Sequence, residues 1–303
     1  MRATVFSAEE VRDAIGMPEA IAAVRDAFIA QSRGEFEVPV RTALRDGQFL
    51  VMSAHHKPSA TAMIKTLSLN FDRTPAIDGT VVRSDLGGVE QTIADAGAVT
   101  TLRTGAASGV ATDLLAPKDA THCVVIGAGG QAADQARAVC AVRPIEALTF
   151  VSRTPERAEA LAKAMADELP GVAVTAGRRI ENAVAEADVI CCATTATEPL
   201  FALDALPPTV HINAIGAFRP TMREVGDEIL ADASVYVDEI DAVLEESGEI
   251  IHALDSGAIA RDDLVELGTA LASDNASGGR TIFKSVGIAV QDWTIADLLT
   301  RCG

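Results

Sequence analysis

The spacing of apolar residues changes several times along the chain, and each change predicts a different kind of element. Residues 18–32 have a helical period, with Ile21, Val24 and Phe28 on one side. From Val38 onward the pattern is that of extended strands, and Asp46-Gly47 between two of them is a strong hairpin signal. The predicted strands are residues 40–44, 49–53, 62–69, 77–82 and 88–93. The N-terminal part is therefore predicted to contain an antiparallel sheet.

A long helix of small residues and then a glycine-rich turn follow this sheet. Residues 95–115 are predicted to be helical, and a strand that ends near residue 126 leads into Gly127-Ala128-Gly129-Gly130-Gln131-Ala132 and an Ala-rich helix. This Gly-x-Gly-x-x-Ala pattern is the dinucleotide fingerprint. Gly127 permits the tight turn, Gly129 permits close approach of a pyrophosphate, and Ala132 lets the helix pack on the strand. The pyrophosphate would bind the N–H groups at the helix N-terminus.

Strands and helices alternate through the rest of the chain, which predicts a mostly parallel sheet covered on both faces. The predicted fold is α/β, with a Rossmann domain built on a doubly wound parallel sheet and a second, α+β domain. The polar residues 273–279 are expected to lead back to the α+β domain, which a strand at 281–283 and a helix at 291–299 would complete. The expected domains are residues 117–279 for the Rossmann domain and residues 1–116 with 280–303 for the α+β domain.

The end of the second Rossmann strand indicates which dinucleotide binds. Proteins that bind NAD(H) usually place an acidic residue there to hold the ribose 2′-hydroxyl, whereas this chain has Ser152-Arg153-Thr154. A guanidinium and two hydroxyls suit a 2′-phosphate, so NADP(H) is predicted rather than NAD(H). Thr154 also suits the position before a helix that starts at Pro155, and this capping role is compatible with cofactor binding.

Composition narrows the possible partners and location. A chain of 303 residues is long for one core, which agrees with two domains. The net charge of −18 argues against binding to nucleic acid or to an anionic membrane surface. No apolar run approaches the roughly 20 residues of a membrane span, and the N-terminus lacks a signal-peptide core, so a cytoplasmic protein is expected. The five cysteines are expected to be reduced, and the histidines have no metal-site spacing, so no metal is predicted.

Three cations lie in settings that suggest chemistry: Arg41 on the hairpin, Lys65 inside an apolar strand and Arg103 inside the small-residue helix. Burying a cation without a partner is costly, so each needs a reason. The cations could bind an anionic ligand. They could instead pair with a local carboxylate such as Asp46 or Asp95, or extend to solvent.

Several motifs, in this order, resemble the ornithine cyclodeaminase/mu-crystallin family over nearly the whole chain. They are Ala62-Met63-Ile64-Lys65, Thr101-Leu102-Arg103-Thr104-Gly105-Ala106-Ala107, the glycine-rich turn at 127–132, His211-Ile212-Asn213-Ala214-Ile215-Gly216-Ala217, Arg223-Glu224, Glu246-Ser247-Gly248-Glu249 and Phe283-Lys284-Ser285-Val286-Gly287-Ile288-Ala289.

The resemblance implies a homodimer joined through the N-terminal sheet, with the active site in the cleft between the two domains. Arg41, Lys65 and Arg103 would hold a substrate carboxylate and would be unpaired until the substrate arrives, with Lys65 and Arg103 as the catalytic residues. Met52, Phe218 and Val286 would also contact the substrate. The residues that would line the dinucleotide are Thr80, Arg103, Thr104, Gly127, Gly129, Gly130, Gln131, Ser152, Arg153, Thr154, Thr194 and Ser285.

Departures from the family pattern indicate which branch the chain resembles. Ornithine cyclodeaminases carry an Asp where this chain has Phe218, and a phenyl ring can neither accept a proton nor pair with an ammonium. A second acidic position falls on Leu50. Arg219-Pro220 and Arg223-Glu224 instead match the mu-crystallin branch, which reduces cyclic ketimines.

The predicted function is therefore NADPH-dependent reduction of a small cyclic ketimine carboxylate, such as pyrroline-2-carboxylate or piperideine-2-carboxylate, to the L-imino acid. Lys65 or His55 could supply a proton. One alternative is an amino-acid oxidoreductase similar to alanine dehydrogenase. Another is an ornithine cyclodeaminase in which Glu224 or Asp227 replaces the missing Asp. An alternative of another class is a crystallin-like protein that binds nucleotide without turnover.

Overall fold

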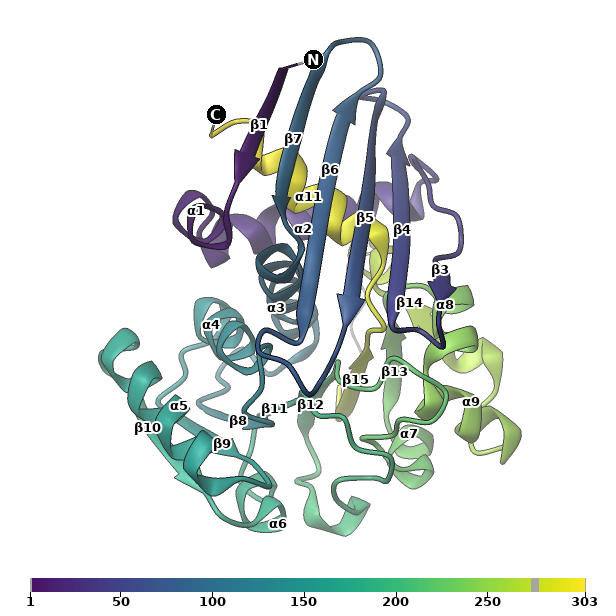
Figure 1. Ribbon diagram of the computed structural model, residues 1–303. Coiled ribbons are helices and arrows are strands. Elements are labelled where there is room, and N and C mark those ends of the chain that lie inside the picture. The colour runs from purple at the N-terminus through teal and green to yellow at the C-terminus, as the bar shows by residue number, and fades with distance from the viewer. Residues whose placement is uncertain (1, 274–277, 303) are drawn as a thin grey trace. The chain divides into compact units, whose positions relative to one another are not determined.

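A computed structural model describes residues 2–273 and 278–302 of the chain (Figure 1). The chain divides into two compact units. Unit 1 comprises Met1–Ala107 and Ile288–Gly303, and unit 2 comprises Ser108–Gly287. Each unit is built around its own sheet. None of the described helices is both long and apolar enough to cross a membrane.

Unit 1 contains a seven-stranded sheet with the strand order β1-β7-β6-β5-β4-β2, and β3 pairs with β4. Neighbouring strands are antiparallel, except that β1 runs parallel to β7. The strands are β1 (Arg2–Phe6), β2 (Phe36–Glu37), β3 (Thr42–Leu44), β4 (Phe49–His56), β5 (Thr61–Leu69), β6 (Ile77–Asp85) and β7 (Glu90–Asp95). The helices are α1 (Ala8–Ala14), α2 (Met17–Ser32), α11 (Ala289–Leu299) and the first part of α3 (Ala96–Leu115).

The alternation of side chains along β5 shows which face of this sheet is covered. Met63, Lys65 and Leu67 are buried, whereas Ile64 between them is exposed. Helix α11 packs against β4, β5, β6 and β7 and against α2 (Figure 1). The predicted hairpin is confirmed: Leu44 pairs with Phe49 across a turn in which Arg45, Asp46 and Gly47 all have positive φ. The parallel edge strand β1 was not predicted.

Unit 2 contains an eight-stranded, wholly parallel sheet with the order β10-β9-β8-β11-β12-β15-β13-β14. The strands are β8 (His122–Ile126), β9 (Ala147–Val151), β10 (Ala173–Gly177), β11 (Val189–Cys192), β12 (Val210–Ala214), β13 (Ser234–Val237), β14 (Leu264–Glu266) and β15 (Arg280–Lys284). The helices are α4 (Ala132–Val142), α5 (Pro155–Glu168), α6 (Ile180–Val184), α7 (Asp227–Asp232), α8 (Ile240–Glu246), α9 (Gly248–Asp255) and α10 (Leu267–Ser273), with short 3-10 turns at Leu203–Ala205 and Arg261–Asp263.

Alternate residues of the central strands of unit 2 enter two separate cores. Cys123 and Val125 of β8 pack in a cluster that includes residues of α4 and α5. Val124 and Ile126 pack in a second cluster, which includes residues of α7 and α9. A strand buried on both faces between two helical layers is the arrangement of a doubly wound sheet. The predicted fold class, a Rossmann domain with a second α+β domain, is confirmed.

The structure places the boundaries of the two units differently from the sequence analysis. Strand β15 pairs with β12 and β13 in the sheet of unit 2, whereas the sequence analysis assigned it to the other domain. A short apolar stretch of sequence predicts a buried strand, but it does not indicate which sheet that strand joins. The first boundary lies inside α3, which runs without a break from Ala96 to Leu115. The predicted connection at 273–279 includes residues 274–277, which lie outside the described residues.

Candidate active site

The glycine-rich turn of unit 2 has the geometry that the fingerprint predicts. Gly127 has a φ of +118°, and a Cβ atom there would collide with the carbonyl of Ala193. A Cβ at Gly129 or Gly130 would meet no atom within 4 Å. The constraint on Gly127 is therefore internal to the fold, whereas Gly129 and Gly130 leave the start of α4 open on the side that a pyrophosphate would approach.

At the end of β9, the hydroxyl of Ser152 accepts a hydrogen bond from the backbone N–H of Thr154, at 3.2 Å. Arg153 and Thr154 are exposed. Thr154 occupies the position before α5, but its hydroxyl makes no capping hydrogen bond, although Pro155 does start the helix. The side-chain capping role considered for Thr154 is thus not seen, and its hydroxyl is not used by the helix.

A buried carboxylate, Glu224, ties together the loops that follow β11 and β12. One oxygen accepts hydrogen bonds from the backbone N–H and the hydroxyl of Thr194, at 2.6 and 2.8 Å. The other accepts from the N–H groups of Gly216 and Ala217, at 2.7 and 3.2 Å. Gly216 must be glycine, because a Cβ there would collide with Thr194 and Glu224. The predicted cofactor residue Thr194 is therefore held in place by Glu224.

The same carboxylate belongs to a buried charged cluster with Glu249 and Lys284. The backbone N–H of Glu224 donates to Glu249 at 3.1 Å, and Glu249 forms a 2.9 Å ion pair with Lys284. The ammonium of Lys284 also donates to the carbonyl of Ala217, at 2.5 Å. Burial raises the pKa of Glu224 to about 7, Glu249 adds to this rise, and Lys284 opposes it. Hydrogen bonds within the protein thus occupy both oxygens of the Glu224 carboxylate. This argues against its use as the substitute acid of a cyclodeaminase.

Asp227, the other acid considered for that role, is also committed to internal contacts. Its carboxylate accepts from the guanidinium of Arg223 at 2.8 Å and from the hydroxyl of Ser256 at 2.8 Å, and lies 2.9 Å from the ring of His252. Phe218 stands where the sequence analysis placed the missing Asp. The guanidinium of Arg219 lies over its ring, 5.5 Å from the ring centre. The structure therefore identifies no replacement for the cyclodeaminase acid at Glu224 or Asp227.

Asp238 holds the loop that follows β15, where two predicted site residues lie. Its carboxylate accepts from the hydroxyl of Ser285 at 2.8 Å and from the N–H groups of Val286 and Gly287, at 3.1 and 2.8 Å. Burial raises the pKa of Asp238, and the hydrogen bonds from Ser285 and Gly287 oppose this rise. Ser285 and Val286 are thus fixed at the carboxyl end of the sheet, where α/β proteins bind their ligands.

In unit 1 two of the predicted substrate-binding cations share one carboxylate. Lys65 is fully buried, and its ammonium donates to Asp292 Oδ1 at 2.7 Å and to the hydroxyl of Thr100 at 2.6 Å. The Nε atom of Arg103 lies 3.3 Å from the same Asp292 oxygen. Nη1 of Arg103 donates to the side-chain oxygen of Gln291 at 2.5 Å. Helix α11 therefore supplies the residues that contact both cations.

The expectation that these cations stay unpaired until a substrate arrives is wrong for Lys65 and Arg103. Asp95, one of the local partners considered, pairs with neither of them and instead accepts from the backbone N–H of Ala98 at the start of α3. Asp292 lies 227 positions from Lys65 in the sequence, so the pairing depends on the tertiary fold. The signal that could have indicated this partner is a carboxylate beside Trp293 in a helix whose residues are mostly apolar.

The charge balance still favours an anion at this cluster, because two cations share a single carboxylate. Burial lowers the pKa of Lys65 to about 8; Asp292 opposes this fall, whereas Arg103 and Arg41 add to it. Arg41 is therefore close enough to act on Lys65 electrostatically. An anion beside Lys65 and Arg103 would relieve this repulsion.

The sheet register shows which other predicted residues lie beside Lys65. Met52 of β4 is buried directly opposite Lys65, on the face that α11 covers. Thr80 of β6 is opposite Thr66, and so lies on the other face of the sheet from Lys65. The hydroxyl of Thr104 donates to the carbonyl of Thr100 within α3. The structure thus groups Met52, Lys65 and Arg103 and places Thr80 away from them.

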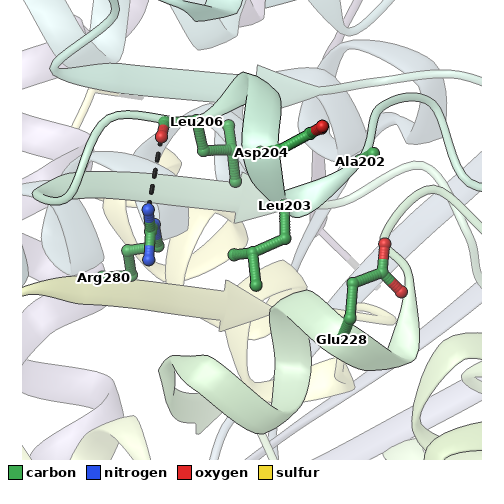
Figure 2. A pocket seen from close by; sticks show the side chains of 6 residues that line it. All are labelled: Ala202, Leu203, Asp204, Leu206, Glu228 and Arg280. Carbon is green, nitrogen blue, oxygen red and sulfur yellow. Dashed lines mark hydrogen bonds between the residues drawn. The ribbon is translucent and has the colours of Figure 1, made fainter.

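Unit 2 has a depression lined by Ala202, Leu203, Asp204, Leu206, Glu228 and Arg280 (Figure 2). The guanidinium of Arg280 donates to the carbonyls of Pro207 and Leu206, at 2.8 and 3.2 Å, and to Asp232 at 2.6 Å. The guanidinium of Arg280 is therefore already hydrogen-bonded and ion-paired within the protein. None of the residues predicted to form the site lines it.

Comparison with known proteins decides which family this arrangement represents. The model that describes the ornithine cyclodeaminase/mu-crystallin family matches residues 1–300. The chain belongs to this family. It is 35% identical to a Delta(1)-pyrroline-2-carboxylate reductase of Bacillus cereus, over 97% of this chain and 95% of that protein. It is 32% identical to the ketimine reductase mu-crystallin of Mus musculus, over 98% and 97% of the two chains.

A solved structure agrees with the sequence comparison. The chain resembles Thermococcus litoralis Delta(1)-pyrroline-2-carboxylate reductase in complex with NADH and L-proline, with a TM-score of 0.92 and 30% identity over 98% of this chain and 96% of the other. The predicted family, its ketimine reductase branch and the predicted class of oxidoreductase acting on C=N bonds are confirmed. The individual roles assigned to the site residues stay predictions.

The two kinds of glycine in the fingerprint turn should respond differently to replacement by alanine. Gly127→Ala should lower the free energy of unfolding by on the order of 3 kcal/mol, because it combines a left-handed φ with a backbone collision. Gly129→Ala should leave thermal stability unchanged but weaken dinucleotide binding by roughly tenfold. Calorimetric unfolding and titration with dinucleotide test both. Unchanged dinucleotide affinity in Gly129→Ala would show that no pyrophosphate lies against this turn.

Proposed function

We propose that this protein reduces a small cyclic ketimine carboxylate, of the pyrroline-2-carboxylate or piperideine-2-carboxylate type, to the corresponding L-imino acid with NADPH. The observation that carries the proposal is the buried cluster in which Lys65 and Arg103 share the single carboxylate of Asp292. This excess of positive charge suits a ligand with one carboxylate. The relatives that reduce pyrroline-2-carboxylate and ketimines support the same substrate class.

The reaction needs a bound carboxylate and a reduced nicotinamide; unit 1 carries the cations for the former and unit 2 carries the fingerprint turn for the latter. Arg41, Lys65 and Arg103 would bind the carboxylate and orient the imine carbon, which must come within roughly 3–3.5 Å of the hydride donor. The fingerprint turn at Gly127 and Gly129 would hold the dinucleotide, which would supply the hydride for the imine carbon. An imine that arrives protonated would need no further acid. Lys65, with a pKa of about 8, is mostly charged at neutral pH and can supply a proton to an imine that arrives neutral.

Cyclodeamination is disfavoured by the contacts of the acids that would have to perform it. Phe218 occupies the position of the cyclodeaminase Asp, and the carboxylate of Glu224 accepts four hydrogen bonds from its own loops. Moving Glu224 to a substrate amine would break all four of these bonds. The ketimine reduction needs no such acid.

Turnover assays separate the proposed reaction from its rivals. NADPH oxidation should be rapid with pyrroline-2-carboxylate or piperideine-2-carboxylate and much slower with pyruvate plus ammonium, because only the cyclic imine arrives with its C=N bond formed. Absorbance at the reduced nicotinamide band follows both reactions. Faster turnover of pyruvate plus ammonium would favour an alanine dehydrogenase-like enzyme, and proline formation from ornithine without added reductant would favour a cyclodeaminase. Nucleotide binding without any of these activities would favour a crystallin-like protein.

The preference for NADPH rests on the end of β9, where Arg153 is exposed beside Ser152 and Thr154 and no carboxylate follows the strand directly. The double variant Ser152→Asp/Arg153→Gly should weaken NADPH binding by about tenfold to a hundredfold, because it removes a guanidinium and adds a charge that repels the 2′-phosphate. NADH binding should change much less. Titration of both dinucleotides measures the difference. Equal losses for the two dinucleotides would contradict the proposed preference. Tighter binding of NADH than of NADPH by the wild type would also contradict it. The Thermococcus relative was solved in complex with NADH.

The homodimer is proposed to form through the sheet of unit 1. Ile64, Val82, Ile93 and Val5 stand opposite one another on adjacent strands and form a row across the sheet, on the face away from α11. Ile64 and Val5 are 45% and 63% exposed, so this row would gain from burial against a second copy.

Ile64→Glu should convert the dimer to a monomer, because dimerisation would bury a charge within this row. Sedimentation velocity measures the change in mass. Val265→Glu, at an exposed apolar position on β14 of unit 2, is the matched control and should remain dimeric. A monomeric wild type, or a dimeric Ile64→Glu variant, would contradict the proposed interface.

A further inference from the structure

Helix α11 holds the two cations of unit 1 through consecutive residues. Asp292 Oδ1 accepts from the ammonium of Lys65 and lies 3.3 Å from Nε of Arg103, while Gln291 accepts from Nη1 of Arg103. With Thr100 and Asp292 as acceptors, Lys65 has one N–H left without a partner among the described residues. Arg103 likewise keeps Nη2 without a partner in the described chain. The contacts with α11 thus select which donors stay available.

The position of α11 on the sheet is itself fixed by two contacts that follow Gln291 and Asp292 along the helix. The indole N–H of Trp293 donates to the hydroxyl of Thr61 on β5, at 3.0 Å. One turn further along, Asp297 forms a 2.8 Å ion pair with Arg83 of β6. Asp292, which immediately precedes Trp293, is fully buried. A carboxylate held this rigidly can hold Lys65 and Arg103 in one geometry.

The cluster keeps polar atoms that its own contacts do not satisfy. Oδ2 of Asp292, Nε2 of Gln291 and Nε of Arg103 are buried and make no hydrogen bond to any described residue. Leaving a buried polar atom without a hydrogen bond is costly, and native structures retain few such atoms without a functional reason. A pair that served stability alone would be better satisfied, so these atoms favour a role in binding.

We propose that Asp292, supported by Gln291, is a positioning residue that holds Lys65 and Arg103 for the substrate carboxylate and sets the upper pH limit of substrate binding. This inference rests on the proposed function and adds to it residues that do not touch the substrate. Asp292 acts through Lys65 and Arg103, and Gln291 acts through Arg103 alone.

The pH limit follows from the charges around Lys65. Asp292 from α11 stabilises the ammonium, whereas Arg103 from α3 and Arg41 disfavour it; Met52 of β4 and Val81 of β6, which flank Lys65 in the sheet, carry no charge. The pKa of Lys65 is about 8 with Asp292 present. Removing the carboxylate lowers that pKa further, so Lys65 loses its proton, and the site its charge, at a lower pH. Carboxylate binding should fail as pH rises through the pKa of Lys65.

The test compares the wild type with Asp292→Asn across a pH range that brackets 8, using the 303-residue chain with NADPH. Asp292→Asn should raise KM for pyrroline-2-carboxylate by roughly tenfold or more and should move the alkaline limb of kcat/KM to lower pH. Gln291→Leu should raise KM without moving that limb, because it removes an acceptor of Arg103 and leaves the charge unchanged. The affinity for NADPH should change much less than KM in both variants.

Asp297→Asn is the matched control, since it removes an ion-paired carboxylate from the same helix but has no contact with Lys65 or Arg103. It should leave both KM and the alkaline limb at their wild-type values. An Asp292→Asn variant with wild-type KM and an unmoved limb would overturn the inference. Equal changes in Asp292→Asn and Asp297→Asn would also overturn it, because they would report a general loosening of α11.

A binding measurement separates failure of this inference from failure of the proposed function. Pyrrole-2-carboxylate is a planar carboxylate without a reducible imine, and calorimetry gives its affinity without turnover. If the wild type binds it and Asp292→Asn does not, the inference holds even where no ketimine is reduced. If the wild type reduces ketimines and Asp292→Asn binds the analogue equally well, the function stands and the inference fails. Absence of binding to the wild type would overturn the inference. Should Asp292→Asn not fold, Gln291→Leu decides by the same measurement: loss of binding supports the inference and wild-type affinity overturns it.

Discussion

Burial of Lys65 and Arg103 against a single carboxylate is the constraint on which the proposed chemistry of unit 1 depends. A buried cation without a partner is too costly to keep, and a fully neutralised pair would leave nothing to attract an anion. Sharing Asp292 between two cations lies between these limits. The partial compensation keeps the cluster folded while leaving positive charge for a ligand.

This constraint also explains why a segment from the end of the chain completes unit 1. Helix α11 covers the sheet and carries Gln291 and Asp292 to the buried side of β5, where Lys65 lies. The sheet and the helix are therefore joined by apolar packing and by charge in the same place. A shift of α11 on the sheet would change which N–H groups of Lys65 and Arg103 remain available to a ligand.

In unit 2, buried carboxylates rather than buried cations fix the loops that carry the predicted site residues. Parallel strands end at the same edge, and their loops expose N–H groups that need acceptors. Glu224 satisfies those that follow β11 and β12, and Asp238 satisfies those that follow β15. The loops that carry Thr194, Ser285 and Val286 are thereby fixed without contributions from a ligand. Preformed loops suit a site that must hold a nicotinamide in one orientation.

Local features of the sequence determined much of this protein. The turn at Gly127, the hairpin at Asp46-Gly47 and the alternation of strands and helices were read correctly, because each depends on neighbouring residues and on backbone geometry. Only the tertiary structure decided which distant elements meet. The pairing of Lys65 with Asp292, the placement of β15 in the sheet of unit 2 and the internal use of Glu224 all join residues that no local pattern connects. A sequence shows that a charge or a strand is buried, whereas its partner is set by the packing of the whole unit.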